Sequence, residues 1–200
     1  HQEEHADYVE SHILAKLATY EGLIIAGAAI HNMDNDVTKS DWKNIYYNLR
    51  IPERAPELLG YGYIEYVKGD NLLEYVNSTK KSVVNDYAVT PAGDRKEYAL
   101  VKYIEPLNDI NTLALGYDMY SDSNRFEAMI IAKDSGEPTL SGPVVAIQDQ
   151  RNPESIKTQS LLMYYPVYQE DRVNIGDTRT LVGYCYIVFR VDDIMQKVNL

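Results

Sequence analysis

The stretch from Glu97 to Pro143 constrains the fold most, because strand and helix patterns alternate within it over short distances. Its first residues alternate between apolar and polar, which is the period of a strand with one buried face, until Pro106 ends the run. A short helix follows, and then the apolar run 113–117, which we interpret as a second strand that ends on Asp118. An amphipathic helix comes next, and a tight turn leads from it into a further strand. Elements this short, in this order, predict a sheet with helices packed against it.

The remaining sequence extends this pattern to a whole domain. Helices are predicted at 5–32, 41–49, 70–84 and 121–135, and again from Asp192. Strands are predicted at 58–67, 97–105, 113–117, 144–149, 160–168 and 180–191, with a polar hairpin loop at 169–177. The last three strands form a predicted antiparallel meander. We therefore predict an α+β fold: a long N-terminal helix, then a PAS-like domain with a roughly five-stranded antiparallel sheet and flanking helices.

Two helix ends carry specific signals. Thr38 or Ser40 precedes the second helix and supplies the hydroxyl that an N-cap needs. Gly136 and Pro138 follow the helix at 121–135, and they suit a left-handed cap and a residue that cannot continue a helix. These signals mark where the helix at 41–49 begins and where the helix at 121–135 ends.

The first helix is unusually long for a globular domain, where helices average about 11 to 12 residues. Apolar residues recur along 5–32 at steps of three and four, and no proline interrupts them. The second half is rich in alanine and glycine, which allows another element to approach closely. Two interpretations remain open: a helix of the core, or a stalk that packs against its twin in a dimer, which its length favours.

Charge excludes several classes of partner. The chain carries a formal net charge of -11, whereas phosphate binding needs clustered lysine and arginine, so we expect no nucleic-acid partner. The same charge disfavours docking on an anionic membrane surface. We find no apolar run of about 18 residues that spans a bilayer. The single cysteine, Cys185, lies within an apolar strand and is interpreted as a small buried hydrophobe.

Nothing in the sequence supports catalysis, a metal or a cofactor. His1 and His5 are spaced for one helix face, but they lie at a terminus and lack a second pair of ligands at a fixed spacing. No Gly-x-Ser-x-Gly nucleophile motif occurs, and Cys185 has no histidine near it in sequence. We predict that the domain is not an enzyme and holds no cofactor.

Asp118 is the polar residue whose position asks most for an explanation. An acid at the end of an apolar strand should be at least half-buried, and a buried carboxylate needs hydrogen-bond donors. By position alone, we favour a cap on the helix that follows or an ion pair with Arg125. The alternative is that Asp118 contacts a ligand.

From Asp41 to Asp193, the sequence resembles the CHASE domains, which are extracytoplasmic sensor modules of histidine kinases, nucleotide cyclases and related signalling proteins. The marks of the resemblance are spread over the second half of the chain. They are Tyr98-x-x-Val101, Tyr103-Ile104-Glu105-Pro106, Asn111, Leu115-Gly116-Tyr117-Asp118, Arg125, Ala132-x-x-Ser135-Gly136, Leu140-Ser141, Tyr165-Pro166-Val167-Tyr168, Arg179 and Leu181-Val182-Gly183. Their order and spacing together are more specific than any one of them.

The resemblance implies a small-molecule sensor domain of a membrane-anchored receptor, on the periplasmic or extracellular side, which signals to a cytoplasmic histidine kinase or cyclase as a homodimer. We divide the chain accordingly into a stalk helix at 1–35, a sensor domain at 36–195 and the start of a connecting helix at 196–200. Family members carry flanking membrane helices and a second, membrane-proximal half, which we expect outside this sequence. The alternative is a ligand-free dimerisation or protein-interaction module.

The resemblance also implies a binding site and reverses the preference at Asp118 towards ligand contact. In plant members, which resemble cytokinin receptors, the acid matching Asp118 contacts an adenine-type ligand, the leucine matching Leu140 lines the pocket and the glycine matching Gly183 borders it. From strand position alone we add five residues to the predicted site: Tyr98, Val101, Tyr103, Gln148 and Tyr164.

The sequence departs from the family pattern at two places along the predicted pocket. Leu100 stands where the family has proline, and Ser141-Gly142-Pro143-Val144 stands where plant members carry threonine, a small residue, proline and phenylalanine. The pocket wall is therefore reshaped. The predicted ligand is an N–H donor such as a purine or an amine, because a carboxylate only accepts hydrogen bonds.

Overall fold

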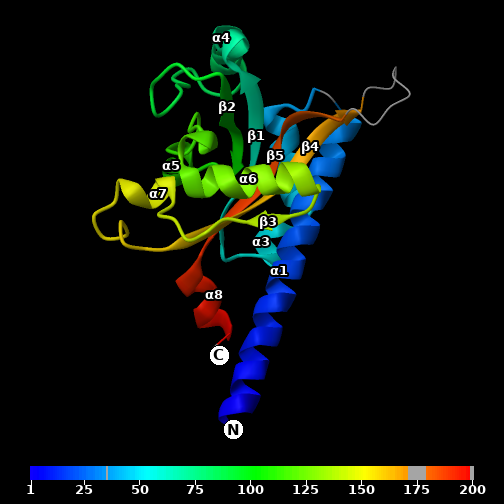
Figure 1. Cartoon of the computed structure of the whole chain (residues 1–200), viewed down its shortest axis with the longest axis vertical. Helices are drawn as coiled ribbons and strands as arrows, with labels where there is room; N and C mark the ends of the chain where they lie inside the picture. The colour runs from blue at the N-terminus through cyan, green and yellow to red at the C-terminus, as the bar shows by residue number, and fades with distance from the viewer. Residues whose placement is uncertain (35, 171–178, 199–200) are drawn as a thin grey trace.

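The computed structural model describes residues 1–34, 36–170 and 179–198. Its centre is a five-stranded antiparallel sheet with the strand order β2-β1-β5-β4-β3. The strands are β1 (Leu58–Lys68), β2 (Glu97–Glu105), β3 (Thr139–Leu140), β4 (Ser160–Glu170) and β5 (Arg179–Arg190). Helices flank this sheet and a long helix precedes it (Figure 1), which confirms the predicted α+β class.

The predicted helices form near their expected positions, and two short helices, at 51–54 and 147–150, were not predicted. The helices are α1 (Gln2–Met33), α2 (Lys39–Asn48), α3 (Ile51–Arg54), α4 (Leu72–Ser82), α5 (Asp109–Thr112), α6 (Ser123–Ser135), α7 (Ile147–Gln150) and α8 (Val191–Val198), with 3-10 turns η1 (Gly69–Asn71) and η2 (Met119–Ser121). Thr38 caps α2 through a capping box with Asp41, and Gly136 ends α6 with a φ of 70°. Both predicted caps are confirmed.

Different helices cover the two faces of the sheet. On one face, α1 and α2 pack an aromatic core around Trp42, which is fully buried. On the other face, α6 lies across the sheet (Figure 1) and covers Tyr164, Tyr184 and Tyr186. We call these the α1 face and the α6 face.

The two halves of α1 differ in their surroundings. The second half is buried against β4 and β5 through residues such as Tyr20, Leu23 and Ile24. The first half projects away from the sheet (Figure 1) and is mostly exposed. Among the described residues, this is the one helix that is long and apolar enough to cross a membrane by length and composition, although no such run was predicted from the sequence. The second half buries one side of the helix in the core, whereas Ile25 and Ile30 on it are exposed. A stalk role for the first half stays a prediction.

Two predicted strands are wrong. The run 113–117 forms turns after α5 and touches the sheet only through its last residues, because the Asn111 side chain holds this segment to the Leu59 and Pro106 carbonyls at 2.9 and 2.8 Å. The run 144–149 makes one bridge, between Val144 and Ser160, and then enters α7. There the buried Asp149 pairs with Arg190 at 2.8 Å, which turns the chain away from the sheet.

The meander therefore takes β3 as its third strand in place of 144–149. Its predicted hairpin loop, 169–177, is corrected at its start, because residues 169 and 170 belong to β4. The remaining residues of that loop lie outside the described residues.

Candidate functional site

Asp118 lies at the edge of the sheet, where the chain runs beside β2. Val101 exchanges two backbone hydrogen bonds with this segment, to the Tyr117 carbonyl at 3.1 Å and from the Gly116 amide at 2.9 Å. Gly116 has a φ of 81°, and a side chain there would collide with the Ala88 carbonyl. The glycine is therefore required for the tight path that brings Asp118 against β2.

The Asp118 carboxylate is 0% exposed and fully hydrogen-bonded. Its Oδ1 accepts from the backbone N–H groups of Ala99 at 2.9 Å and Tyr120 at 3.1 Å, and the second bond caps η2. Its Oδ2 accepts from Arg95 Nε at 2.8 Å, in an ion pair. Asp118 therefore caps the 3-10 turn η2, whereas the helix it was predicted to cap, α6, is capped by Asp122. Its ion-pair partner is Arg95 and not Arg125, whose guanidinium lies 3.2 Å from Asp122.

Arg95 links this buried acid to the surface. Its side chain is 26% exposed and its guanidinium lies 4.8 Å from the centre of the Tyr98 ring. Its Nη2 donates to the Pro91 carbonyl and its backbone N–H to the Tyr98 hydroxyl, both at 2.8 Å. The guanidinium is thus held by one carboxylate, one carbonyl and one aromatic ring.

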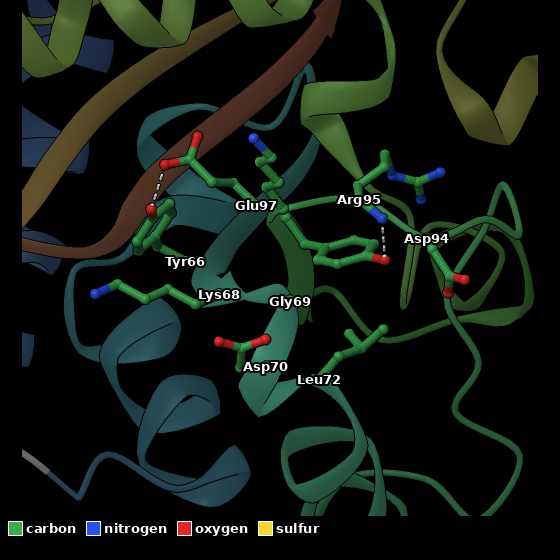
Figure 2. A pocket seen from close by; sticks show the side chains of 10 residues that line it. Tyr66, Lys68, Gly69, Asp70, Leu72, Asp94, Arg95 and Glu97 are labelled. Carbon is green, nitrogen blue, oxygen red and sulfur yellow. Dashed lines mark hydrogen bonds between the residues drawn. The ribbon is translucent and has the colours of Figure 1, made fainter.

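Arg95 and Tyr98 also line a surface groove of about 630 Å³ (Figure 2). This volume lies in the range of small-molecule sites, roughly 300–1,000 Å³. The lining combines cations, acids and two tyrosines: Tyr66, Lys68, Gly69, Asp70, Leu72, Asp94, Arg95, Lys96, Glu97 and Tyr98. Tyr66 donates to Glu97 at 2.6 Å, and burial together with this bond raises the pKa of Tyr66 to about 12. The groove can hold a polar or charged ligand of modest size.

A second, much smaller cavity of about 10 Å³ lies under α6 and α7. Its lining includes Gln148, which donates to Asn111 Oδ1 at 3.1 Å, and the buried residues Arg125 and Tyr186. Within the described parts of the chain, neither Arg125 Nε nor the Tyr186 hydroxyl has a hydrogen-bond partner. Room of this size suits about one water molecule.

The structure brings some of the predicted site residues together. Tyr98 meets Asp118 through Arg95, which contacts both. Val101 and Tyr164 are buried on the α6 face, in one apolar cluster, and Gln148 lines the small cavity on the same side. A ligand role for these residues stays a prediction.

Three other predicted residues lie apart from Asp118. Tyr103 belongs to the α1 face and donates to the Val37 carbonyl at 2.8 Å. Leu140 is 37% exposed on β3, at the sheet edge opposite to β2. Gly183 is on β5, and a Cβ there would meet the Ile64 carbonyl and the Tyr63 hydroxyl, so close packing accounts for this glycine.

Sequence reasoning missed Arg95, the residue that joins the acid to the groove. The segment that carries it reads as a polar turn, YAVTPAGDR, and one arginine in such a turn carries no signal of its own. Only the path of the chain, which places residue 95 beside residue 118, makes the pair visible.

A protein-family model described as the CHASE domain matches residues 35–200. No curated protein matches the chain.

Proposed function

Because the chain belongs to the CHASE family of sensor domains, we propose that it is the small-molecule-binding domain of a membrane-bound receptor. In this proposal the domain lies outside the cytoplasm and passes ligand occupancy to a cytoplasmic histidine kinase or nucleotide cyclase. CHASE is a sensor domain and not a catalytic one, so any enzymatic output belongs to another part of the parent protein.

One observation carries the proposal: a buried carboxylate, on a motif that resembles the family's ligand contact, connects to a groove of ligand size. Asp118 is fully buried, yet its ion-pair partner Arg95 lines that groove. A ligand with N–H donors or a positive charge would suit such a carboxylate. The tyrosine rings of the groove offer flat surfaces for a heterocycle or a cation.

Glu57 supports a route from the domain to its output. Its carboxylate accepts from Tyr20 at 2.5 Å and lies 3.0 Å from Lys16, and both residues are on α1. It also lies 3.0 Å from Lys197 on α8, at the other end of the chain. A ligand that favours one arrangement of the domain would therefore bias the relation between the first and last helices, in proportion to its differential affinity.

A thermal-shift screen with purines, amines and amino acids tests the proposal, because a ligand that binds only the folded state raises Tm. The expected result is a compound that stabilises the wild type and loses most of this effect in Asp118→Asn, which keeps an oxygen for the two backbone N–H groups. Asp122→Asn is the matched control, because Asp122 also acts as a cap and pairs with an arginine, but that arginine, Arg125, does not line the groove. Equal shifts in wild type and Asp118→Asn would reject the site.

A dimerisation module is the second candidate, and the exposed side of α1 favours it. Tyr8 and Leu14 are large apolar residues exposed on the projecting half of this helix. Light scattering at increasing protein concentration tests this candidate. Dimers that disappear in a Tyr8→Ser, Leu14→Ser double variant would support it, whereas a monomer throughout would not.

A further inference from the structure

The contacts around Asp118 separate its two oxygens by function. Oδ1 is committed to two backbone N–H groups, from Ala99 and Tyr120, which belong to the scaffold. Oδ2 receives its one described bond from a side chain, Arg95. A backbone donor cannot leave without breaking the fold, but a side chain can. Oδ2 is therefore the position at which one donor can be exchanged for another.

Arg95 occupies this position as a removable group. Its side chain is partly exposed and Arg95 is among the residues that line the groove, whereas Asp118 is fully buried and does not line it. Figure 2 shows Arg95 and Asp94 on one side of the groove and Tyr66 and Glu97 on the other. The loop fits around the guanidinium, because a Cβ on Gly93 would lie 3.0 Å from Arg95 Nη1.

We propose that Arg95 is a built-in occupant of a guanidinium-type binding site on Asp118, and that the ligand of the sensor must displace it through the groove. This inference rests on the proposed function. It names the ligand class: a planar cation with adjacent N–H donors, such as a guanidinium or an amidinium group.

Charge selects this class. When Arg95 leaves, the buried carboxylate loses its counter-charge, and an uncompensated buried charge is costly. A neutral ligand or an anion does not restore the balance, whereas a planar cation does, and it repeats the hydrogen bond of Arg95 Nε. The Tyr98 ring, 4.8 Å from the guanidinium, offers the same cation–π contact to the incoming group.

Tethering explains why the site discriminates. Arg95 is part of the chain, so it competes with any free cation at a high effective concentration, and the Pro91 carbonyl and the Tyr98 ring also hold its guanidinium in place. A simple cation in solution therefore fails to displace it. A ligand succeeds when it gains further contacts with the groove, so Arg95 sets the threshold for binding.

Chemical rescue tests the inference without knowledge of the natural ligand. Arg95→Ala leaves a space beside Asp118, and methylguanidinium chloride at about 20 mM should raise Tm of this variant by about 3 °C. The wild type should shift by less than about 1 °C under the same conditions, because its own arginine fills the site. Sodium chloride at equal ionic strength controls for screening. The double variant Arg95→Ala, Asp118→Asn should show no rescue.

Absence of rescue in a folded Arg95→Ala variant would overturn the inference, and so would equal rescue in the double variant. If Arg95→Ala does not fold, Arg95→Ser provides the same space with a hydroxyl and is tested in the same way. The result is separate from the ligand screen. If methylguanidinium rescues Arg95→Ala but no compound in the screen raises Tm, the exchangeable site stands and the sensor proposal is rejected. If a compound raises Tm in a manner that depends on Asp118 but methylguanidinium gives no rescue, only the role of Arg95 is rejected.

Discussion

The α1 face and the α6 face of the sheet differ in how their buried side chains pack and how their buried polar atoms are paired. On the α1 face, large aromatic rings stack around Trp42, and their polar atoms are paired with backbone carbonyls: Trp42 Nε1 with Tyr61 at 3.2 Å, and the Tyr103 hydroxyl with Val37 at 2.8 Å. On the α6 face, tyrosines lie among alanine, methionine and aliphatic side chains, and the buried Tyr186 hydroxyl has no partner within the described residues.

The difference indicates that the two faces have different structural roles. A fully paired aromatic core makes a rigid support, because each buried polar group would cost free energy if it moved away from its partner. On a face with an unpaired hydroxyl and small side chains, fewer interactions fix the positions of the buried side chains. The candidate site lies at the β2 edge of the sheet. The segment that carries Asp118 reaches this edge from the α6 face.

The largest effect is expected at the centre of the α1 face. Trp42→Ala should lower the free energy of unfolding by about 3–5 kcal/mol, because it deletes a fully buried ring and leaves a cavity. Urea unfolding followed by circular dichroism measures the change. A loss below about 1 kcal/mol would contradict the assignment of this face as the support, since surface substitutions have effects of that size.

Acid should weaken the contacts of Glu57 with α1 and α8, which we call the junction of these helices. Burial raises the pKa of Glu57, but hydrogen bonds from Tyr20, its own backbone, Lys16 and Lys197 outweigh burial and hold the pKa at about 2. Because the folded pKa lies below the unfolded value of about 4.3, this contribution is present above that value and is lost as pH falls towards 2. It amounts to roughly 2–3 kcal/mol at neutral pH.

The measurement is urea unfolding at several pH values between 7 and 2. Glu57→Gln should lower stability at pH 7 and flatten the pH dependence between about 4.3 and 2. Glu53→Gln is the matched control, because Glu53 is exposed in the preceding helix. A Glu57→Gln protein with the acid profile of the wild type would show that the junction does not depend on this charge.

The smallest effect is expected from one hydroxyl on each face. Tyr103→Phe should cost about 1 kcal/mol, because it leaves the Val37 carbonyl without its donor. Tyr186→Phe should change stability by less than about 0.5 kcal/mol or raise it slightly, because its hydroxyl has no described partner to lose. Parallel urea titrations compare the two variants. The reverse order would contradict the difference between the faces.

Patterns local in sequence predicted most of the fold. The alternation of 97–105 and the apolar runs of β4 and β5 mark strands directly, and Thr38 and Gly136 mark helix ends. The prediction of a strand at 144–149 was wrong. The apolar residues of this run suit a strand, but Asp149 pairs with the distant Arg190 and the chain turns away. A pairing between residues far apart in sequence overrides a local preference.

The candidate site could be predicted only in part for the same reason. The burial of Asp118 follows from its place after an apolar run, but the predicted cap on the next helix is made by Asp122, and Asp118 caps the 3-10 turn η2 before it. Its choice of Arg95 over Arg125 depends on how the loop before β2 folds against the sheet edge, and no periodicity encodes this. The position of Leu140 at the opposite edge likewise depends on strand order.

A crystal structure of the wild type, with a compound that raises its Tm, tests the central claim most directly. We predict that a nitrogen of the compound lies within hydrogen-bonding distance of Asp118 Oδ2, and that Arg95 Nε has left its position 2.8 Å from that oxygen. A compound bound elsewhere, with the pair of Arg95 and Asp118 intact, would contradict the account.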